Sequence, residues 1–300
     1  MEIGILFLAS HPITPGIHQL NLWKEWVATK EKKIRIVIHI DTKDRSVLGD
    51  WDKYCIDNPV KTQWGSDTLV EAHLQVLKEC YKRYPKVSEF FLVSGSCIPI
   101  QPVTTFCSMK GSFFNIVSVD KPDKEEWQKQ LMNSGASPQL AAKSLQTEQW
   151  CILSREHVKI LLSESFNNKT GIWSYFKKIQ QNLALEGYVP DEYFIYWFLR
   201  CHGVTEKQIK DKYLMLSFRK NADSPSPITF DSLDTPYEVF WDVNKKKKIS
   251  LRKILQKEKD DSLLFRKVSA SLIIKLSDII ITPQEKKKRS RSPKKNKRLN

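Results

Sequence analysis

Two short runs of apolar, β-branched residues set the strongest limit on the fold of this chain. Residues 3–9 (IGILFLA) and 34–40 (IRIVIHI) have the length and composition of buried strands. Between them, residues 17–29 carry apolar side chains at helical spacing, Trp23 and Trp26 among them. Strand, helix and strand in this order predict a βαβ unit, whose two strands run parallel in one sheet.

The rest of the chain continues this alternation. The further expected elements are a helix over 67–83, strands over 89–94, 112–118 and 150–154, helices beginning at residue 155 and at Pro190, a Lys-rich turn at 245–248 and a helix over 268–279. We therefore expect an α/β fold with a Rossmann-like, mostly parallel sheet flanked by helices. It is expected to form a single large domain over residues 1–282, followed by a separate tail over 283–300.

The net charge of +15 is concentrated in that tail. Residues 285–300 contain nine Lys or Arg and one Glu, and they show no apolar periodicity, so we expect them to be disordered. Such a segment can bind nucleic acid or an acidic membrane surface through its charge. A solubilising or targeting role explains the composition equally well.

The spacing of the cysteines and the sequence near the amino terminus indicate where in the cell the protein could be found. The six cysteines form no CxxC pair and no Cys/His pattern typical of zinc, and a reducing compartment is the simpler interpretation. The apolar run at 3–9 is too short to cross a membrane and lacks the flanks of a signal peptide. We therefore expect no membrane anchor, and a protein that is cytoplasmic or peripheral to a membrane.

Polar residues follow two of the expected strands at the points where the strands end. Ligands of parallel sheets bind at the carboxyl ends of the strands, so His39, Asp41, Ser94 and Ser96 are candidates for substrate binding. The Asp41 carboxylate could accept hydrogen bonds from a ribose or a base, although an Asp at this position more often caps a turn. Two hydroxyl groups around Gly95 are poor ligands for Mg²⁺ or Mn²⁺, so we expect no metal there.

Asp191 and Glu192 lie at the expected start of a helix, directly after Pro190. Acidic residues in a first helical turn complement the helix dipole, and in isolation this explanation is the better one. The functional alternative is that Glu192 is a general base, which removes a proton from an attacking hydroxyl group. The sequence contains no GxxxxGK[ST], GxGxxG, GxSxG or HExxH motif to support another chemistry.

Positive side chains near the end of the chain could bind a diphosphate. Without a metal, the charge of a departing nucleoside diphosphate has to be balanced by Arg and Lys. Arg266 and Lys267 follow an apolar strand-like segment and are the best candidates, and Arg219 and Lys245–Lys248 are weaker ones. Each could equally be an ordinary surface cation.

Taken in order, these segments resemble the core-2/I-branching β-1,6-N-acetylglucosaminyltransferase family, which also contains the peptide O-xylosyltransferases. The resemblance extends from about residue 3 to residue 280. The matching segments are His39-Ile40-Asp41, Gln63-Trp64-Gly65, Leu92–Pro99, Gln149-Trp150 with Ser154-Arg155, Pro190-Asp191-Glu192 and Leu264-Phe265-Arg266-Lys267. The family's animal members begin with a membrane anchor and carry disulfides, and we expect no such anchor in this chain.

The resemblance implies a GT-A fold and an inverting transfer from a UDP-sugar without a metal cofactor. It implies that Glu192 is the catalytic base and that Lys267, with Arg266 or Arg219, binds the diphosphate. The residues expected to bind substrate are His39, Asp41, Ser94, Ser96, Trp150, Arg155 and Asp191. N-acetylglucosamine is the favoured sugar and xylose the alternative, while the acceptor is not indicated. A catalytically inactive member, or a nucleic-acid-binding protein that acts through its basic tail, is the alternative from another class.

Overall fold

The fold is that of a computed structural model. The described residues are 2–9, 22–28, 33–41, 45–116, 125, 128–129, 131–133, 136–163, 173–174, 176–177, 189–212, 214–217, 237–242, 245–253 and 262–266. Four predicted features lie outside them: Arg219, Lys267, the helix over 268–279 and the basic tail over 283–300.

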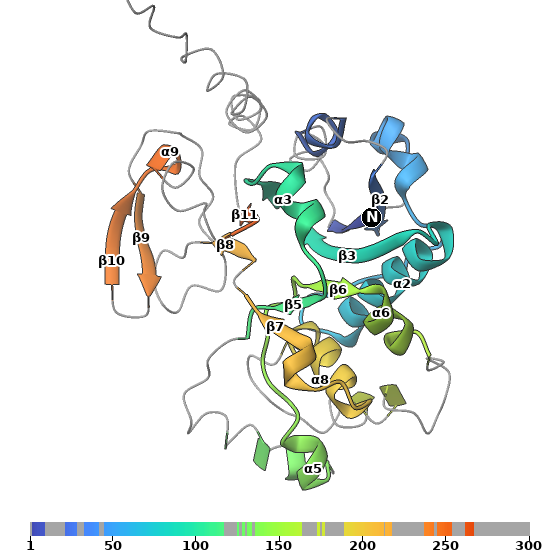
Figure 1. The fold of residues 1–300 in the computed structure, drawn as a ribbon, viewed down its shortest axis with the longest axis vertical. Helices are drawn as coiled ribbons and strands as arrows, with labels where there is room; N and C mark the ends of the chain where they lie inside the picture. The colour runs from blue at the N-terminus through green and yellow to red at the C-terminus, as the bar shows by residue number, and fades with distance from the viewer. Residues whose placement is uncertain are drawn as a thin grey trace, which may run out of the picture.

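Within the described residues, a six-stranded sheet forms the centre of the molecule (Figure 1). Its strands in spatial order are β2 (Ile34–Ile40), β1 (Glu2–Ala9), β3 (Val87–Ser94), β6 (Ile152–Ser154), β5 (Ser112–Phe114) and β7 (Ile209–Asp211). β1 is parallel to β2 and β3, and β5 is parallel to β7. β6 is antiparallel to both of its neighbours, β3 and β5. The expected α/β fold with a mostly parallel sheet is therefore confirmed.

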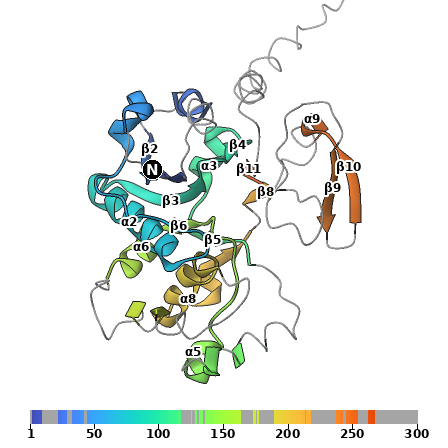
Figure 2. The ribbon, with the colours of Figure 1, turned by 180° about the vertical axis from the view of Figure 1, so that it is seen from behind.

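Helices cover both faces of this sheet (Figures 1 and 2). The helical residues 22–28 and α3 (Val103–Ser108) share one apolar cluster with the odd-numbered side chains of β1. α2 (Asp67–Arg83), α6 (Arg155–Leu161) and α8 (Phe194–Cys201) share the other cluster. With both faces covered, β1 to β3 are apolar almost throughout, which is why their sequence signal is so clear.

α2 begins and ends where the sequence predicts. The Ser66 side chain accepts a hydrogen bond from the backbone N–H of Thr68, as an N-cap residue does. Val70, Leu74 and Leu77 recur on one face of the helix and are buried against the sheet. Local capping and a long apolar stripe thus specify this helix without help from distant residues.

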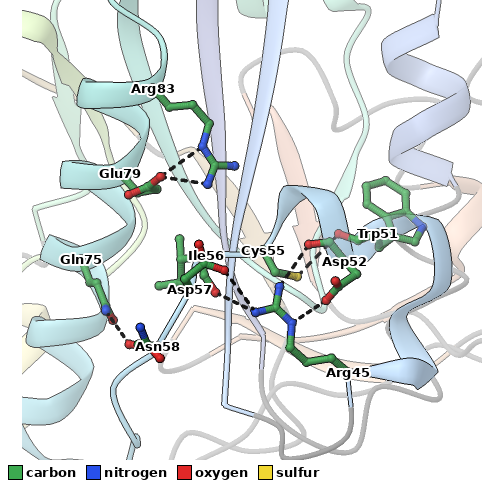
Figure 3. A network of polar contacts seen from close by, with 10 residues as sticks. All are labelled: Arg45, Trp51, Asp52, Cys55, Ile56, Asp57, Asn58, Gln75, Glu79 and Arg83. Atoms are coloured by element: carbon green, nitrogen blue, oxygen red, sulfur yellow. Dashed lines mark hydrogen bonds and ion pairs between the residues drawn. The ribbon is translucent and has the colours of Figure 1, made fainter.

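Polar contacts join residues within the segment between β2 and α2, and they join this segment to α2 (Figure 3). The Arg45 guanidinium forms an ion pair with Asp52, which raises the pKa of Arg45, and it also donates to the carbonyl of Ile56. Gln75 on α2 donates to the carbonyl of Asn58 at 2.8 Å. These contacts fix the chain on either side of η2 (Ser46–Tyr54), just after the end of β2.

A second, smaller sheet lies beside the end of β3. It contains β4 (Ile98–Pro99), β11 (Leu264–Arg266) and β8 (Met215–Ser217), with β11 in the middle. β11 is antiparallel to β4 and parallel to β8. The end of the described chain is thereby brought next to residues that directly follow the Ser94–Ser96 turn.

The Lys-rich segment is a strand, so the prediction of a turn at 245–248 is wrong. β10 (Lys245–Ile249) pairs with β9 (Tyr237–Asp242) in an antiparallel hairpin that stands apart from the central sheet (Figure 2). The apolar and aromatic residues of β9 supply a partner strand, and this pairing outweighs the low strand preference of lysine.

The remaining short elements are α5 (Pro138–Ala141), η3 (Pro190–Glu192), η4 (Glu206–Gln208) and α9 (Leu251–Lys253). The strand expected at 112–118 is regular only over 112–114, and it continues as a single bridge between Ile116 and Thr147. All six cysteines are free. In the part of the chain that the structure describes, no helix has the length and apolar character needed to cross a membrane.

Candidate functional site

One edge of the central sheet gathers most of the predicted residues. Leu8 of β1 is in register with His39 on one side and with Ser94 on the other, so the carboxyl ends of the first three strands are level. Because β6 is antiparallel, the residues that precede it, around Trp150, lie at this same edge. The topology thus brings segments from four strands to one place, as expected for the ligand edge of an α/β sheet.

Asp41 directly follows β2 at this edge. Its Oδ2 atom accepts a hydrogen bond from the backbone N–H of Thr62 at 3.3 Å. The neighbouring His39 side chain is only 1% exposed, and burial lowers its pKa although the charge of Asp41 opposes this effect. The hydrogen bond joins Asp41 to a residue 21 positions further along the chain, while the turn that Asp41 was expected to cap, at residues 42–44, lies outside the described residues.

Trp64 is an exposed residue near Asp41 to which the sequence had assigned no role. Its side chain is 78% exposed, and the other large apolar side chain exposed among the described residues, Met132, reaches only 39%. Gly65 follows with a φ of 71°, a conformation that glycine adopts without strain, and this turn leads into the Ser66 cap of α2. An exposed indole beside a strand-end carboxylate can stack on a base or a sugar.

Ser94, Gly95 and Ser96 form a tight turn at the end of β3. The two serine hydroxyl groups are 2.9 Å apart, and the backbone N–H of Ser96 donates to the Ser94 hydroxyl oxygen. Gly95 donates its N–H to the carbonyl of Leu8 at 2.8 Å. A Cβ atom on Gly95 would lie 3.1 Å from the Cβ of Ala9, so this close approach of β1 and β3 favours glycine. Among the described residues, no three His, Cys, Asp or Glu side chains form a metal-binding group.

Glu192 is fixed by a loop from the other half of the sheet. It closes η3, a single turn, and its backbone carbonyl accepts hydrogen bonds from the N–H and the hydroxyl group of Thr147, at 2.8 and 3.1 Å. The Gln146 side-chain amide donates to Glu192 Oε2 at 2.8 Å. Glu192 itself is half-buried. Sequence reasoning missed Gln146 and Thr147, because nothing in a local pattern connects them with a residue so far along the chain.

Asp191 is buried beside Glu192. Its side chain is 2% exposed, and neither carboxylate oxygen has a hydrogen-bond partner among the described residues. Burial raises the pKa of Asp191 to about 7; its own backbone N–H opposes this increase, and the nearby charge of Glu192 adds a smaller one. Burial and the charge of Glu192 also raise the pKa of Tyr193 to about 12. Asp191 thus gives Glu192 an acidic neighbour in a poorly solvated turn.

Trp150 is a packed residue at the same edge. Its side chain is 5% exposed, and it makes an edge-to-face contact with His73 of α2, with 6.1 Å between the ring centroids. His73 is fully buried, and burial, aided by His39, lowers its pKa to about 3. Trp150 is therefore packed in the core, as the alternative interpretation holds. It could affect a bound sugar only by shaping the surface of the site.

Arg155 does not belong to this group. Its guanidinium donates to the backbone carbonyls of Tyr81 and Val87 and lies 3.9 Å from the centre of the Tyr81 ring. Val87 begins β3 and Ser94 ends it, so Arg155 lies about 20 Å from the ligand edge at about 3.3 Å per residue. The prediction that Arg155 binds substrate is corrected accordingly: its hydrogen bonds join the end of α2 to the start of β3.

Among the cations predicted to bind a diphosphate, Lys245–Lys248 lie in β10, and Lys267 and Arg219 lie outside the described residues. Arg266 is described. It ends β11, where its backbone is in register with Ser217 of β8. β11 also pairs with β4, which begins two residues after Ser96. The backbone of Arg266 therefore ends β11 close to the Ser94–Ser96 turn, while the roles of Lys267 and Arg219 remain predictions.

The described part of the chain thus has an α/β fold with an acidic pair and a strand-end Asp at the ligand edge of its sheet. The chain belongs to the core-2/I-branching enzyme family, whose model matches residues 13–234. The family expected from the sequence is therefore confirmed. The matched range includes Asp41, Glu192 and Arg219, and it ends before Arg266 and Lys267.

Several solved structures of glycosyltransferases are similar to this chain. The galactosyltransferase LgtC, in complex with donor and acceptor sugar analogues, is 10% identical over 71% of this chain and 76% of its own, with a TM-score of 0.42. A glycosyltransferase involved in glycosylation of the major capsid of PBCV-1 is 10% identical over 92% and 99%, with a TM-score of 0.37. GlyE of Streptococcus pneumoniae TIGR4 is 8% identical over 71% and 45%, with a TM-score of 0.36. No curated protein matches the chain in sequence.

Proposed function

We propose that this protein is an inverting glycosyltransferase that transfers N-acetylglucosamine from its UDP derivative to an acceptor hydroxyl group, without a metal ion. The observation that carries the proposal is the placement of the Glu192 carboxylate. It is held by Gln146 at the ligand edge of the sheet, in a turn where Asp191 is buried next to it. A carboxylate that only complemented a helix dipole would need neither the hydrogen bond from Gln146 nor the burial of Asp191.

In the proposed reaction, Glu192 takes the proton of the acceptor hydroxyl group as its oxygen attacks the anomeric carbon. The bond between that carbon and the diphosphate oxygen breaks, and UDP leaves with the electron pair. Attack from the opposite face converts an α-linked donor into a β-linked product. Positioned general bases of this kind contribute about 10²–10⁴-fold to a rate.

Other residues support donor binding in this proposal. Asp41 directly follows β2 and is bonded to Thr62, two residues before the exposed Trp64, and these two side chains would receive the nucleoside. Lys267, with Arg266 or Arg219, would balance the charge of the departing diphosphate. The hydroxyl groups of Ser94 and Ser96 hydrogen-bond to each other where a metal-dependent enzyme would need carboxylates. Xylose is the alternative sugar, since the family resemblance covers both activities.

The proposal is tested by measuring UDP release and transfer with UDP-N-acetylglucosamine, UDP-xylose and UDP-glucose over a panel of hydroxyl acceptors. We expect activity with UDP-N-acetylglucosamine that survives EDTA. Glu192→Gln should lower the rate constant kcat by about 10²–10⁴-fold, because an amide cannot accept the proton.

Glu156→Gln is a matched control for the dipole explanation. Glu156 is an exposed acid in the first turn of α6, which begins at the opposite edge of the sheet. Loss of either first-turn charge should reduce stability by about 0.3–1 kcal/mol, but only the change at Glu192 should abolish transfer. Equal activity of wild type and Glu192→Gln would disprove the assignment of the base.

A further inference from the structure

The loop that precedes β6 is anchored to the sheet on two sides. Thr147 forms a bridge with Ile116, and Glu148 donates its N–H to the carbonyl of Asn115 at 2.9 Å, both beyond the end of β5. On the other side, Cys151 accepts a hydrogen bond from Leu92 of β3. The residues from 147 to 151 are therefore held by the two strands that flank β6.

From this support, the loop holds Glu192 at two points. Thr147, itself 2% exposed, fixes the backbone of Glu192 through two hydrogen bonds to its carbonyl oxygen. Gln146 fixes the side chain through the 2.8 Å bond to Oε2. The η3 turn alone could not do this, since it is three residues long and shows no side-chain cap.

The chemistry of Gln146 suits a donor to a base. Its amide N–H can orient a carboxylate through one oxygen, but it has no proton to release and no charge to neutralise the carboxylate. A lysine in the same place would form an ion pair, and an apolar side chain would remove the hydrogen bond to Oε2. Errors of about 1 Å in the position of a reacting group can lower a rate by about 10²-fold.

We propose that Gln146 is a positioning residue for Glu192, through which the loop before β6 sets the orientation of the base. This inference rests on the proposed function and deepens it. Gln146 acts through Glu192 and does not touch the reacting atoms. Its loss should therefore reduce turnover and leave donor binding almost unchanged.

The test compares kcat and KM for the donor in wild type, Gln146→Met and Gln146→Glu. Gln146→Met has a similar size and no donor, and we expect kcat to fall about 10–10²-fold while KM changes less than about twofold. Gln146→Glu places a second carboxyl group beside Glu192. It should be as slow as Gln146→Met at alkaline pH and recover as the pH falls, because a protonated carboxyl group can donate to Glu192.

Gln208→Met is the matched control, because Gln208 accepts hydrogen bonds from Thr205 at the opposite edge of the sheet and should keep wild-type kinetics. Wild-type kcat in Gln146→Met would overturn the inference, as would a Gln146→Glu to Gln146→Met ratio that does not change with pH. If Glu192→Gln is inactive while Gln146→Met is fully active, only the inference fails. If wild type itself transfers no sugar, the proposed function fails with it.

Discussion

At the scale of single residues, the site combines side chains that the sequence identifies with others that only the fold reveals. Asp41 and Glu192 stand out in sequence, because each lies where an element ends or begins. Gln146 does not, because its partnership with Glu192 depends on the pairing of β3, β5 and β6. Arg155 was identified from the sequence but lies away from the other site residues. A motif gives the order of residues in the chain, but not the end of the strand at which a side chain lies.

Trp64 provides a test of nucleotide binding at this scale. If its indole stacks on the uracil or the sugar of the donor, Trp64→Ala should weaken UDP-sugar binding about 10-fold, since such stacking contributes about 1–3 kcal/mol. The exposed side chain contributes little to packing, so the free energy of unfolding should stay within about 0.5 kcal/mol of wild type. Calorimetric titration with the UDP-sugar measures the first effect and urea unfolding the second. An unchanged dissociation constant would show that Trp64 does not contact the donor.

At the scale of elements, the sequence predicts best those helices and strands that are specified by residues close together in the chain. The helix over 67–83 and the strand over 34–40 were predicted to the residue, because a cap, an apolar stripe or a β-branched run specifies them locally. The lysines of β10 gave the wrong prediction, since their strand conformation depends on β9. The short strands β4 and β11 pair across more than 150 residues of chain, and no local signal could indicate that contact.

The junction of β1 and β3 can be tested through Gly95. In Gly95→Ala, the new methyl group would meet Ala9, and we expect a loss of about 1–3 kcal/mol in the free energy of unfolding. Because the turn carries Ser94 and Ser96, donor binding should weaken as well. Adding Ala9→Gly removes the methyl group that would lie 3.1 Å away but leaves the backbone of residue 9 at 3.2 Å, so the double variant should recover part of the stability. A single variant as stable as wild type, measured by urea unfolding, would show that the two strand ends can separate freely.

At the scale of the whole molecule, buried titratable groups give stability two opposing dependences on pH. Burial lowers the pKa of His73 to about 3, so its contribution is complete above the ordinary value of 6.5 and is lost as the pH falls toward 3. Burial raises the pKa of Asp191 from 3.8 to about 7, so its contribution is complete below 3.8 and is lost as the pH rises through 7. As the pH falls from 6.5 to 3.8, the contribution of His73 to stability decreases while that of Asp191 increases.

Replacing Asp191 separates the two dependences of stability on pH. Asp191→Asn should be more stable than wild type at about pH 8, by about 2–4 kcal/mol, because a buried charge is removed. The difference should shrink toward zero at about pH 4, where Asp191 is protonated in wild type. His73 is present in both proteins, so its effect cancels. Urea unfolding at several pH values measures the difference, and a gap that is the same at both ends of the range would contradict the burial of an ionisable Asp191.

The reversed direction of β6 also has a consequence for how the protein reaches its active form. Leu92 and Cys151 are bonded across a long stretch of chain, and Glu192 joins the ligand edge only after the loop before β6 is in place. Closing such loops carries an entropic penalty that slows folding. We therefore expect that, during refolding, burial of the amino-terminal βαβ unit precedes the return of transferase activity. The catalytic edge would then be among the last parts of the molecule to form.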